Sequence, residues 1–333
     1  MLARMLRMSA YTLTPIATTG DQFAGFAPYV PSIGPDGTIA FQASLRAGGS
    51  GLYAGRGGSV RAIVRSGDGV GEIVSHPDVN RRGDCCFYAG TARGNQGVFL
   101  VSNGRATELW PAAGPLGPTI NESGAAAFRA PAPSGAGVYR VACGSVAVIA
   151  ATGAEYVAFH GLPVIDERGC VLFRADLPGG RQAVMLARED GLKTIAATGH
   201  EFSALGAFPA LNGAGLAAFC ASMRAGGSGV FVSDGVGARM VIDDRGAFES
   251  FRGAIVDSDG RAVLIATARG GSLGVFCGPD PTAHRVLGVG APLLGSEVAE
   301  FALNPVSING AGQLAVRVRL DDGREVILRG DPG

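Results

Sequence analysis

The stretch Leu211-Asn-Gly-Ala-Gly-Leu-Ala-Ala-Phe219 contains the pattern that decides the fold. An Asn or Asp side chain can close a turn on its own backbone, and a glycine three residues later takes a positive φ without steric cost. The apolar residues that follow, ending in Ala218-Phe219, indicate a buried strand. The stretch therefore predicts a tight turn between two antiparallel strands.

This pattern recurs so that the chain holds seven copies at a nearly constant interval. Successive turn glycines are 46, 41, 45, 46, 45 and 52 residues apart, and an apolar pair such as Val230-Phe231 follows each of them after 13 or 14 residues. No 3.6-residue period persists, so each unit is expected to form four short strands. The turn glycines are Gly37, Gly83, Gly124, Gly169, Gly215, Gly260 and Gly312.

Four-stranded units of about 46 residues have the size of a propeller blade. We therefore predict an all-β fold, a seven-bladed β-propeller of four-stranded antiparallel blades. Residues 11–333 are expected to form this single domain, preceded by a flexible N-terminal segment over residues 1–10. The last unit has only three strands, whereas Thr14–Gly20 matches the outer strands that end at Gly153 and Gly199. The N-terminal strand is therefore expected to pair with the C-terminal blade and close the ring.

The repeated motif resembles that of a bacterial family of tandem NxxGxxAF-repeat proteins, with Asn121–Phe128 and Asn212–Phe219 as the cleanest copies. It is similar, more loosely, to TolB-type propellers, in which a Pro-Asp-Gly turn precedes an Ile-Ala-Phe strand, as in Pro35–Phe41. The resemblance covers the chain from about Tyr11 and implies the propeller fold, but no particular chemistry. Members of the repeat family are typically exported and often surface-anchored.

Composition excludes several kinds of partner. Lys plus Arg and Asp plus Glu both number 28, so no net field attracts nucleic acid or an acidic membrane. No apolar run approaches the roughly 20 residues of a spanning helix, and Met1–Thr14 lacks the apolar core of a secretory signal, so a cytoplasmic location is expected. The six cysteines have no CxxC spacing and are expected to be reduced, buried thiols.

The connections from each outer strand to the next inner strand are long and unequal, from Gly114–Pro118 to Gly288–Asn304. In a propeller these connections and the loops between second and third strands lie on one face, around the axis. We expect them to shape an asymmetric pocket for a small-molecule ligand or substrate in a monomeric protein. No cofactor is predicted, although the loop carboxylates are residues of a type that can bind a divalent metal ion.

Three of the four histidines lie in these connections near a carboxylate. A histidine positioned beside a carboxylate is a common arrangement for general acid–base catalysis. The alternative is that a carboxylate after glycine only caps a turn or is solvated. The predicted catalytic residues are His76 with Glu72, His160 with Glu155, and His200 with Glu201.

The predicted substrate-binding residues are loop acids, arginines of the second-to-third strand loops, and two aromatic residues. Arginines around a mouth can clamp a carboxylate or phosphate, and the alternative is an inherited repeat residue that pairs with a neighbouring group. The acids are Asp21, Asp68, Glu249, Glu297 and Glu300; the arginines are Arg46, Arg93, Arg181, Arg224 and Arg269; the aromatic residues are Phe26 and Phe159.

Together these features predict a small-molecule-binding propeller with a central-face pocket that acts as a cofactor-independent acid–base enzyme of lyase, cyclase, isomerase or hydrolase type. The alternative is a non-catalytic binding or protein-interaction scaffold. The scaffold predicts separated histidines on an open surface, whereas the enzyme predicts histidines that share a cavity.

Overall fold

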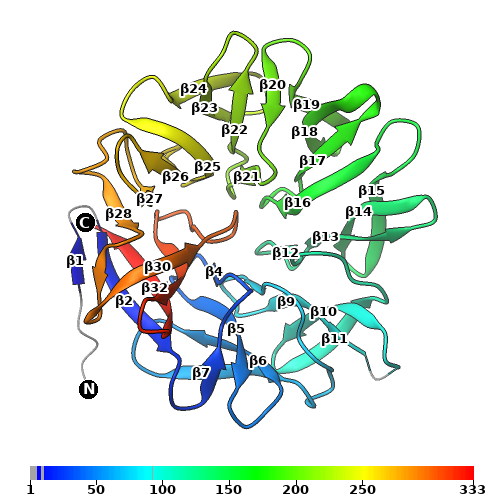
Figure 1. The fold of residues 1–333 in the computed structure, drawn as a ribbon. Helices are drawn as coiled ribbons and strands as arrows, with labels where there is room; N and C mark the ends of the chain where they lie inside the picture. Colours follow the sequence, from blue (N-terminus) through cyan, green and yellow to red (C-terminus); the bar gives the residue numbers. More distant parts are fainter. Residues whose placement is uncertain (1–5, 9–10, 92) are drawn as a thin grey trace.

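The computed structural model describes residues 6–8, 11–91 and 93–333, which form seven antiparallel sheets arranged in a ring (Figure 1). The predicted seven-bladed propeller is confirmed. The only helical segment in the described part of the chain is one 3-10 turn, Pro178–Gly180. No described helix has the length and apolar character needed to cross a membrane.

We number the blades one to seven along the chain and give their strands from the axis outward. Blade one has an interrupted inner strand, β3 (Phe23–Gly25) and β4 (Ser32–Ile33), then β5 (Ile39–Leu45), β6 (Ser50–Gly55) and β7 (Val60–Arg65). Blade two contains β8 (Asp78–Val79), β9 (Cys85–Gly90), β10 (Gln96–Ser102) and β11 (Arg105–Trp110). Blade three contains β12 (Thr119–Ile120), β13 (Ala126–Ala132), β14 (Gly135–Ala142) and β15 (Ser145–Ala151).

The remaining blades follow the same order. Blade four contains β16 (Ala158–Ile165), β17 (Val171–Leu177), β18 (Arg181–Arg188) and β19 (Gly191–Ala197). Blade five contains β20 (Phe202–Leu205) and β21 (Ala210–Leu211), then β22 (Ala217–Met223), β23 (Ser228–Ser233) and β24 (Ala238–Asp243). Blade six contains β25 (Phe248–Val256), β26 (Ala262–Ala268), β27 (Leu273–Phe276) and β28 (Arg285–Gly288). Blade seven contains β30 (Ser296–Ala302), flanked by the short β29 (Pro292–Leu293), then β31 (Leu314–Leu320), β32 (Glu325–Pro332) and β2 (Tyr11–Thr18).

The N-terminal strand closes the ring, as the sequence predicts. Strand β2 pairs antiparallel with β32, with Thr14 opposite Arg329 and Ala17 opposite Ile327, and the C-terminus lies beside β1 and β2 (Figure 1). Of the segment expected to be flexible, residues 1–5 and 9–10 lie outside the described residues. Leu6–Met8 is described, and it forms strand β1, which pairs with the outer edge of β2.

The repeated turn is held by its own Asn side chain. In blade five the Oδ1 atom of Asn212 accepts a hydrogen bond from the backbone N–H of Leu216 (2.9 Å), while Gly215 has a φ of 86° and donates to the Asn212 carbonyl (3.0 Å). The Nδ2 atom of Asn212 donates to the backbone carbonyl of Asp257 in blade six (2.6 Å). The motif therefore closes a turn and also ties that turn to the next blade.

The same tie recurs at other blade junctions. It needs an amide donor, so it is made where the turn begins with Asn. The equivalent bonds run from Asn80 to the carbonyl of Asn121 (3.3 Å), from Asn121 to that of Asp166 (3.0 Å), and from Asn309 to that of Gly34 (3.0 Å). Gly34, Asp166 and Asp257 occupy this position in the other three blades. Glycine has no side chain, and a carboxylate offers no hydrogen-bond donor.

Several inner strands begin earlier than the sequence suggests, which corrects the expectation of long loops. Strands β16, β20, β25 and β30 lie within or reach into segments interpreted as connections. Register shifts interrupt the pairing, for example between His160 and Val164 in β16. Such bulges break the two-residue alternation by which a strand is recognised. Consequently Glu249 lies on β25 and both Glu297 and Glu300 lie on β30, rather than in loops.

The described cysteines are all free, as expected, but they are not all buried. Cys85, Cys86 and Cys170 are buried, whereas Cys143 is exposed in a hairpin with a φ of 49°.

Candidate functional site

Four predicted carboxylates lie in one repeated surface turn. The turn spans four residues and begins with glycine, whose N–H donates to the carbonyl of an apolar residue three positions later. Examples are Gly67 to Val70 and Gly153 to Tyr156, both 2.8 Å. The four exposed carboxylates in these turns are Asp21, Asp68, Glu155 and Glu201. This placement fits the alternative interpretation that they are solvated turn residues.

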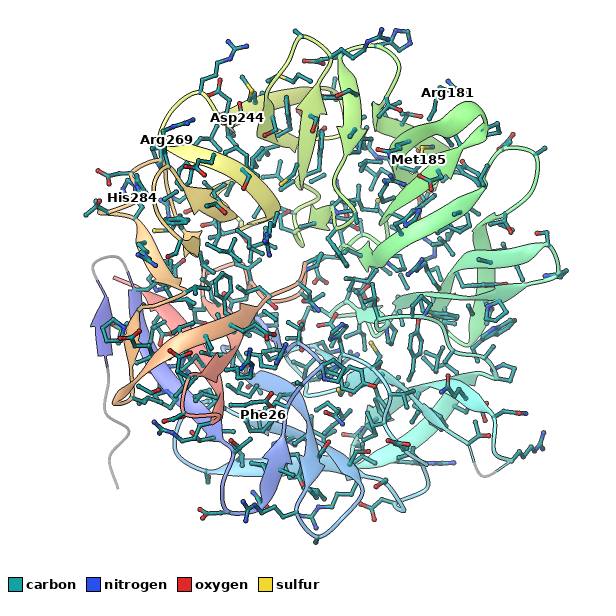
Figure 2. All side chains as sticks on the ribbon, in the orientation of Figure 1. Phe26, Arg181, Met185, Asp244, Arg269 and His284 are labelled. Carbon is teal, nitrogen blue, oxygen red and sulfur yellow. The ribbon has the colours of Figure 1, made fainter. Side chains whose placement is uncertain are left out.

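The predicted arginines also lie on the surface. Arg224 braces one of these turns, and Arg269 braces the corresponding connection of blade six. Arg224 donates to the carbonyl of Gly199 (2.9 Å), and Arg269 donates to the carbonyls of Gly246 (3.0 Å) and Asp244 (2.6 Å). Arg181 and Arg269 lie at the outer perimeter of the ring, far from its hub (Figure 2). Arg46 and Arg93 are also exposed. The expected ring of arginines around a central mouth is therefore not formed.

The three histidines have separate environments. His76 is 8% exposed, and its Nδ1 atom accepts a hydrogen bond from the backbone N–H of Val30 (2.7 Å). Burial lowers the pKa of His76 to about 4, so this imidazole is neutral at pH 7. The ring of Tyr29 packs edge-on against it. His200 is exposed in a surface turn.

His160 is hydrogen-bonded to Asp176 rather than to Glu155. Its Nε2 atom lies 2.7 Å from Oδ2 of Asp176, and Oδ1 of the same carboxylate lies 2.5 Å from NH1 of Arg174. His160 is on β16, and its two partners are on β17, the neighbouring strand. No described hydrogen bond or ion pair joins His76 to Glu72 or His200 to Glu201. The structure therefore does not assemble the three predicted pairs.

The remaining predicted residues serve the blades themselves. Phe26 lies in blade one (Figure 2), fully buried against Phe23 and Phe41. Phe159 is buried against Phe173 in blade four. Glu249 accepts the backbone N–H of Gly270 (2.8 Å), Glu300 pairs with Arg317 (3.2 Å) and with Arg319 (3.3 Å), and Glu297 is exposed. None of these groups faces the pocket described next.

A pocket of about 480 Å³ lies on the axis of the ring, because residues of all seven blades line it. Its walls are the ends of the inner strands, and its mouth is the circle of inner-to-second strand turns. This turn end of the axis is opposite the face on which the sequence predicts the site. Every blade contributes an apolar side chain to the wall, but polar groups make up at least as much of the exposed lining. The apolar side chains are Ile33, Val79, Ile120, Val164, Leu211, Val256 and Val306.

Asp78 is the buried ionisable group in this wall. It is 6% exposed, and its two oxygens accept backbone hydrogen bonds from Val79 (2.9 Å) and from Ile120 of blade three (2.8 Å). Burial raises the pKa of Asp78 to about 7; the two backbone donors oppose this change, and the nearby charges of Glu167 and Glu122 add to it. Both protonation states of Asp78 are therefore populated near neutral pH.

Two more carboxylates stand at the mouth. Glu122 accepts the backbone N–H of Arg81 (2.9 Å), and Glu167 accepts that of Glu122 (3.0 Å), so the side chains run around the rim from blade to blade. Burial, together with the charge of Glu122, raises the pKa of Glu167. On the opposite side the mouth carries small neutral residues, including Ala214 and Gly310. The pocket is thus acidic on one side only.

Sequence reasoning missed Asp78, although a signal was present. The residue two positions before the first turn residue is Ser32, Thr119, Val164, Ala210, Ile255 or Ser307 in the other blades. Asp78 is the only ionisable side chain at this position, and a departure from a repeat is where a grafted site is expected.

No family model and no curated protein matches the chain. Among solved structures, an oligogalacturonate lyase in complex with manganese is similar with a TM-score of 0.59 and 12% identity, over 100% of this chain and 98% of that one. An oligogalacturonate lyase from Vibrio parahaemolyticus has a TM-score of 0.55 and 12% identity, over 99% and 98% of the chains. A puromycin-hydrolyzing peptidase of Mycobacterium tuberculosis has a TM-score of 0.57 and 13% identity, over 90% of this chain but 50% of its own.

At these identities the likeness shows a shared propeller fold. This chain spans nearly the full length of the lyases and half the length of the peptidase. The manganese of the first lyase has no counterpart in donor groups here, because the described residues contain no cluster of three or more His, Cys, Asp or Glu side chains that could hold a metal ion.

Proposed function

We propose that this chain binds a small molecule in the axial pocket and exchanges a proton with it through Asp78, as an acid–base enzyme. The single observation that supports this most is the position of Asp78. Four ionisable side chains line the pocket, Asp78, Arg81, Glu122 and Glu167, and Asp78 is the one that is buried. A concave pocket into which several polar groups converge is a common form of small-molecule site.

The environment of Asp78 suits proton transfer. A general acid or base is most effective when its pKa is close to the working pH, and burial brings the pKa of Asp78 there. The N–H groups of Val79 and Ile120 fix the carboxyl group against the wall, so its free lone pairs keep one orientation. Glu122 and Glu167 can accept hydrogen bonds from ligand hydroxyl or amino groups at the mouth. Proton abstraction, as in a lyase or isomerase, is the reaction class that this arrangement supports.

The test combines binding with conversion. A panel of small metabolites is screened by thermal shift, and each compound that raises the melting temperature is incubated with the protein and followed by mass spectrometry. Asp78→Asn should retain binding within a few-fold and lose conversion, whereas the exposed matched control Asp190→Asn should behave as wild type. Conversion that persists in Asp78→Asn would refute the catalytic role.

A non-catalytic binding propeller is the second candidate, and two observations favour it. The predicted histidines are separated, and none of them lines the axial pocket, as this alternative predicts. Both oxygens of Asp78 already accept backbone hydrogen bonds, one of them from the next blade, so the residue also acts as a structural tie. If this alternative is correct, ligands bind to the wild-type protein and are recovered chemically unchanged after incubation with it. Ala311→Trp, which fills the exposed mouth, should abolish binding under either candidate, and unchanged binding would exclude the pocket.

A further inference from the structure

The charges that line the axial pocket are unevenly distributed around its axis. The ionisable side chains of the lining are three carboxyl groups and one guanidinium, those of Asp78, Glu122, Glu167 and Arg81. They come from blades two, three and four, which are consecutive, whereas the other four blades contribute no ionisable side chain to the lining. An excess of one charge on one side of a concave site favours a ligand that carries the opposite charge at one end.

Each carboxylate at the mouth uses one oxygen in the rim and leaves the other available. Oε1 of Glu122 accepts the backbone N–H of Arg81 (2.9 Å), and Oε2 of Glu167 accepts that of Glu122 (3.0 Å). Within the described part of the chain, the second oxygen of each group has no hydrogen-bond or ion-pair partner, and the guanidinium of Arg81 forms no ion pair. Glu122 is half-buried and Glu167 is exposed, so a ligand can reach both second oxygens.

Asp78 adds a third carboxyl group deeper on the same side. It lies on β8, two residues before the turn of blade two, whereas Glu122 and Glu167 are turn residues at the mouth. Burial raises the pKa of Asp78, and the charges of Glu167 and Glu122 raise it further, so the three groups are close enough to repel one another. A cation bound among carboxylates offsets this repulsion.

The other side of the pocket suits an uncharged body. Leu211, Val256 and Val306 of blades five, six and seven present aliphatic side chains, and the turns of these blades bring only neutral residues to the lining. This side therefore has no ionic partner for a second charge on the ligand. The pocket volume of about 480 Å³ lies within the range of small-molecule sites.

We propose that the ligand of the axial pocket is a primary amine, whose ammonium group binds at Glu122 and Glu167 and whose apolar body lies toward blades five to seven. This inference rests on the proposed function, in which the axial pocket is the ligand site, and adds the chemical class of the ligand. An ammonium group has three donors and no acceptor, so it can use both available oxygens. Charge-assisted hydrogen bonds of this kind are roughly twice as strong as neutral ones.

The test compares three probes of similar size that differ in charge: 2-phenylethylamine, 2-phenylethanol and phenylacetate. Binding to the full chain is measured at neutral pH by isothermal titration calorimetry, at low and at physiological salt concentration. We expect the amine to bind at least about tenfold more tightly than the alcohol, and phenylacetate to bind most weakly. Physiological salt should weaken binding of the amine and leave that of the alcohol unchanged.

The variants Glu122→Gln and Glu167→Gln test which charges select the amine. Glutamine keeps an oxygen that can accept the rim N–H, but it places an NH2 donor where the available carboxylate oxygen was. Each variant should weaken binding of the amine by at least about threefold and change that of the alcohol much less. Glu189→Gln is the matched control, because it removes the same charge from an exposed hairpin between β18 and β19, outside the pocket. It should leave the affinity for every probe unchanged.

Three results would overturn the inference: no probe binds wild type, the alcohol or phenylacetate binds as tightly as the amine, or the Glu122→Gln/Glu167→Gln double variant binds the amine with wild-type affinity. Ala311→Trp distinguishes these failures from failure of the proposed function. If it abolishes binding of the alcohol or phenylacetate, the axial pocket remains the ligand site and only the ligand class is wrong. If the amine still binds to Ala311→Trp, it binds elsewhere, and both proposals fail.

Discussion

The side-chain amide of Asn212 donates to the backbone carbonyl of Asp257 across 2.6 Å, so the turn of blade five is fastened to the turn of blade six. We expect Asn212→Asp to keep the local turn, because Oδ1 still accepts the N–H of Leu216, but to lose this bond. The loss should cost about 1–3 kcal/mol of unfolding free energy, since a buried carbonyl loses its donor and faces a carboxylate. Urea unfolding measures the change, with Asn95→Asp on the exposed surface as the control. Equal stability of the two variants would show that the tie is unimportant.

The junction between blades six and seven offers the reverse experiment. Asp257 holds its own turn through Oδ1, which accepts the N–H groups of Asp259 and Arg261 (both 2.9 Å). Asp257→Asn preserves these bonds and adds a donor toward the carbonyl of Asn309. We expect a gain of about 0.5–1.5 kcal/mol. A decrease in the urea midpoint would contradict the proposed geometry of the tie.

Strand β2 should contribute as much to stability as an internal strand. Leu13 is 1% exposed and belongs to the same apolar cluster as Leu328 of β32. Leu13→Ala is therefore expected to cost about 2–5 kcal/mol, as for other buried leucines. The partly exposed Thr12→Ala is the control, and the measurement is chemical denaturation. If both variants lose equally little, the closing strand is only loosely attached.

Stability should depend on pH through Asp78. Its pKa is raised by burial from 3.8 to about 7, so between these values the folded chain binds more protons than the unfolded chain. The stability that protonated Asp78 contributes to the folded chain is therefore fully present below pH 4 and is lost as the pH rises through 7. Asp78→Asn removes this pH dependence, because asparagine does not titrate. The unfolding free energy of the variant minus that of wild type should therefore rise by on the order of 4 kcal/mol from pH 4 to pH 8. Parallel pH profiles of wild type and variant would rule out the raised pKa.

A hydroxyl supports the third strand in several blades. The Oγ1 atom of Thr198 accepts the backbone N–H of Gln182 (2.8 Å), and Thr152 does the same for Ala136 (3.0 Å). Thr198→Val keeps the shape but leaves that N–H without an acceptor, which should cost about 1–2 kcal/mol. Thr198→Ser should recover most of this loss in thermal denaturation. A serine variant no more stable than the valine variant would assign the effect to packing.

The repeat carried enough information for the architecture but not for the site. The Asn-x-x-Gly turns and the match of Thr14–Gly20 to other outer strands predicted seven blades and the closing strand, because both depend on local backbone chemistry. The predicted histidine pairs were not found, because proximity in sequence does not fix side-chain direction: His160 contacts Asp176 on the adjacent strand. A central pocket was predicted, but its lining residues were not, since they come from the inner strands and turns of seven separate blades and converge only in the closed ring.

The Asn side-chain hydrogen bonds between blades are present at four of the seven blade junctions and missing at the other three. Where Gly34, Asp166 and Asp257 begin the turn, the neighbouring blades are joined without that fastening. Transient opening of the ring should therefore start at these three blade junctions. New termini engineered by circular permutation should be tolerated best at the same junctions. The four asparagines therefore stabilise the closed ring and also determine which blade junctions open most easily.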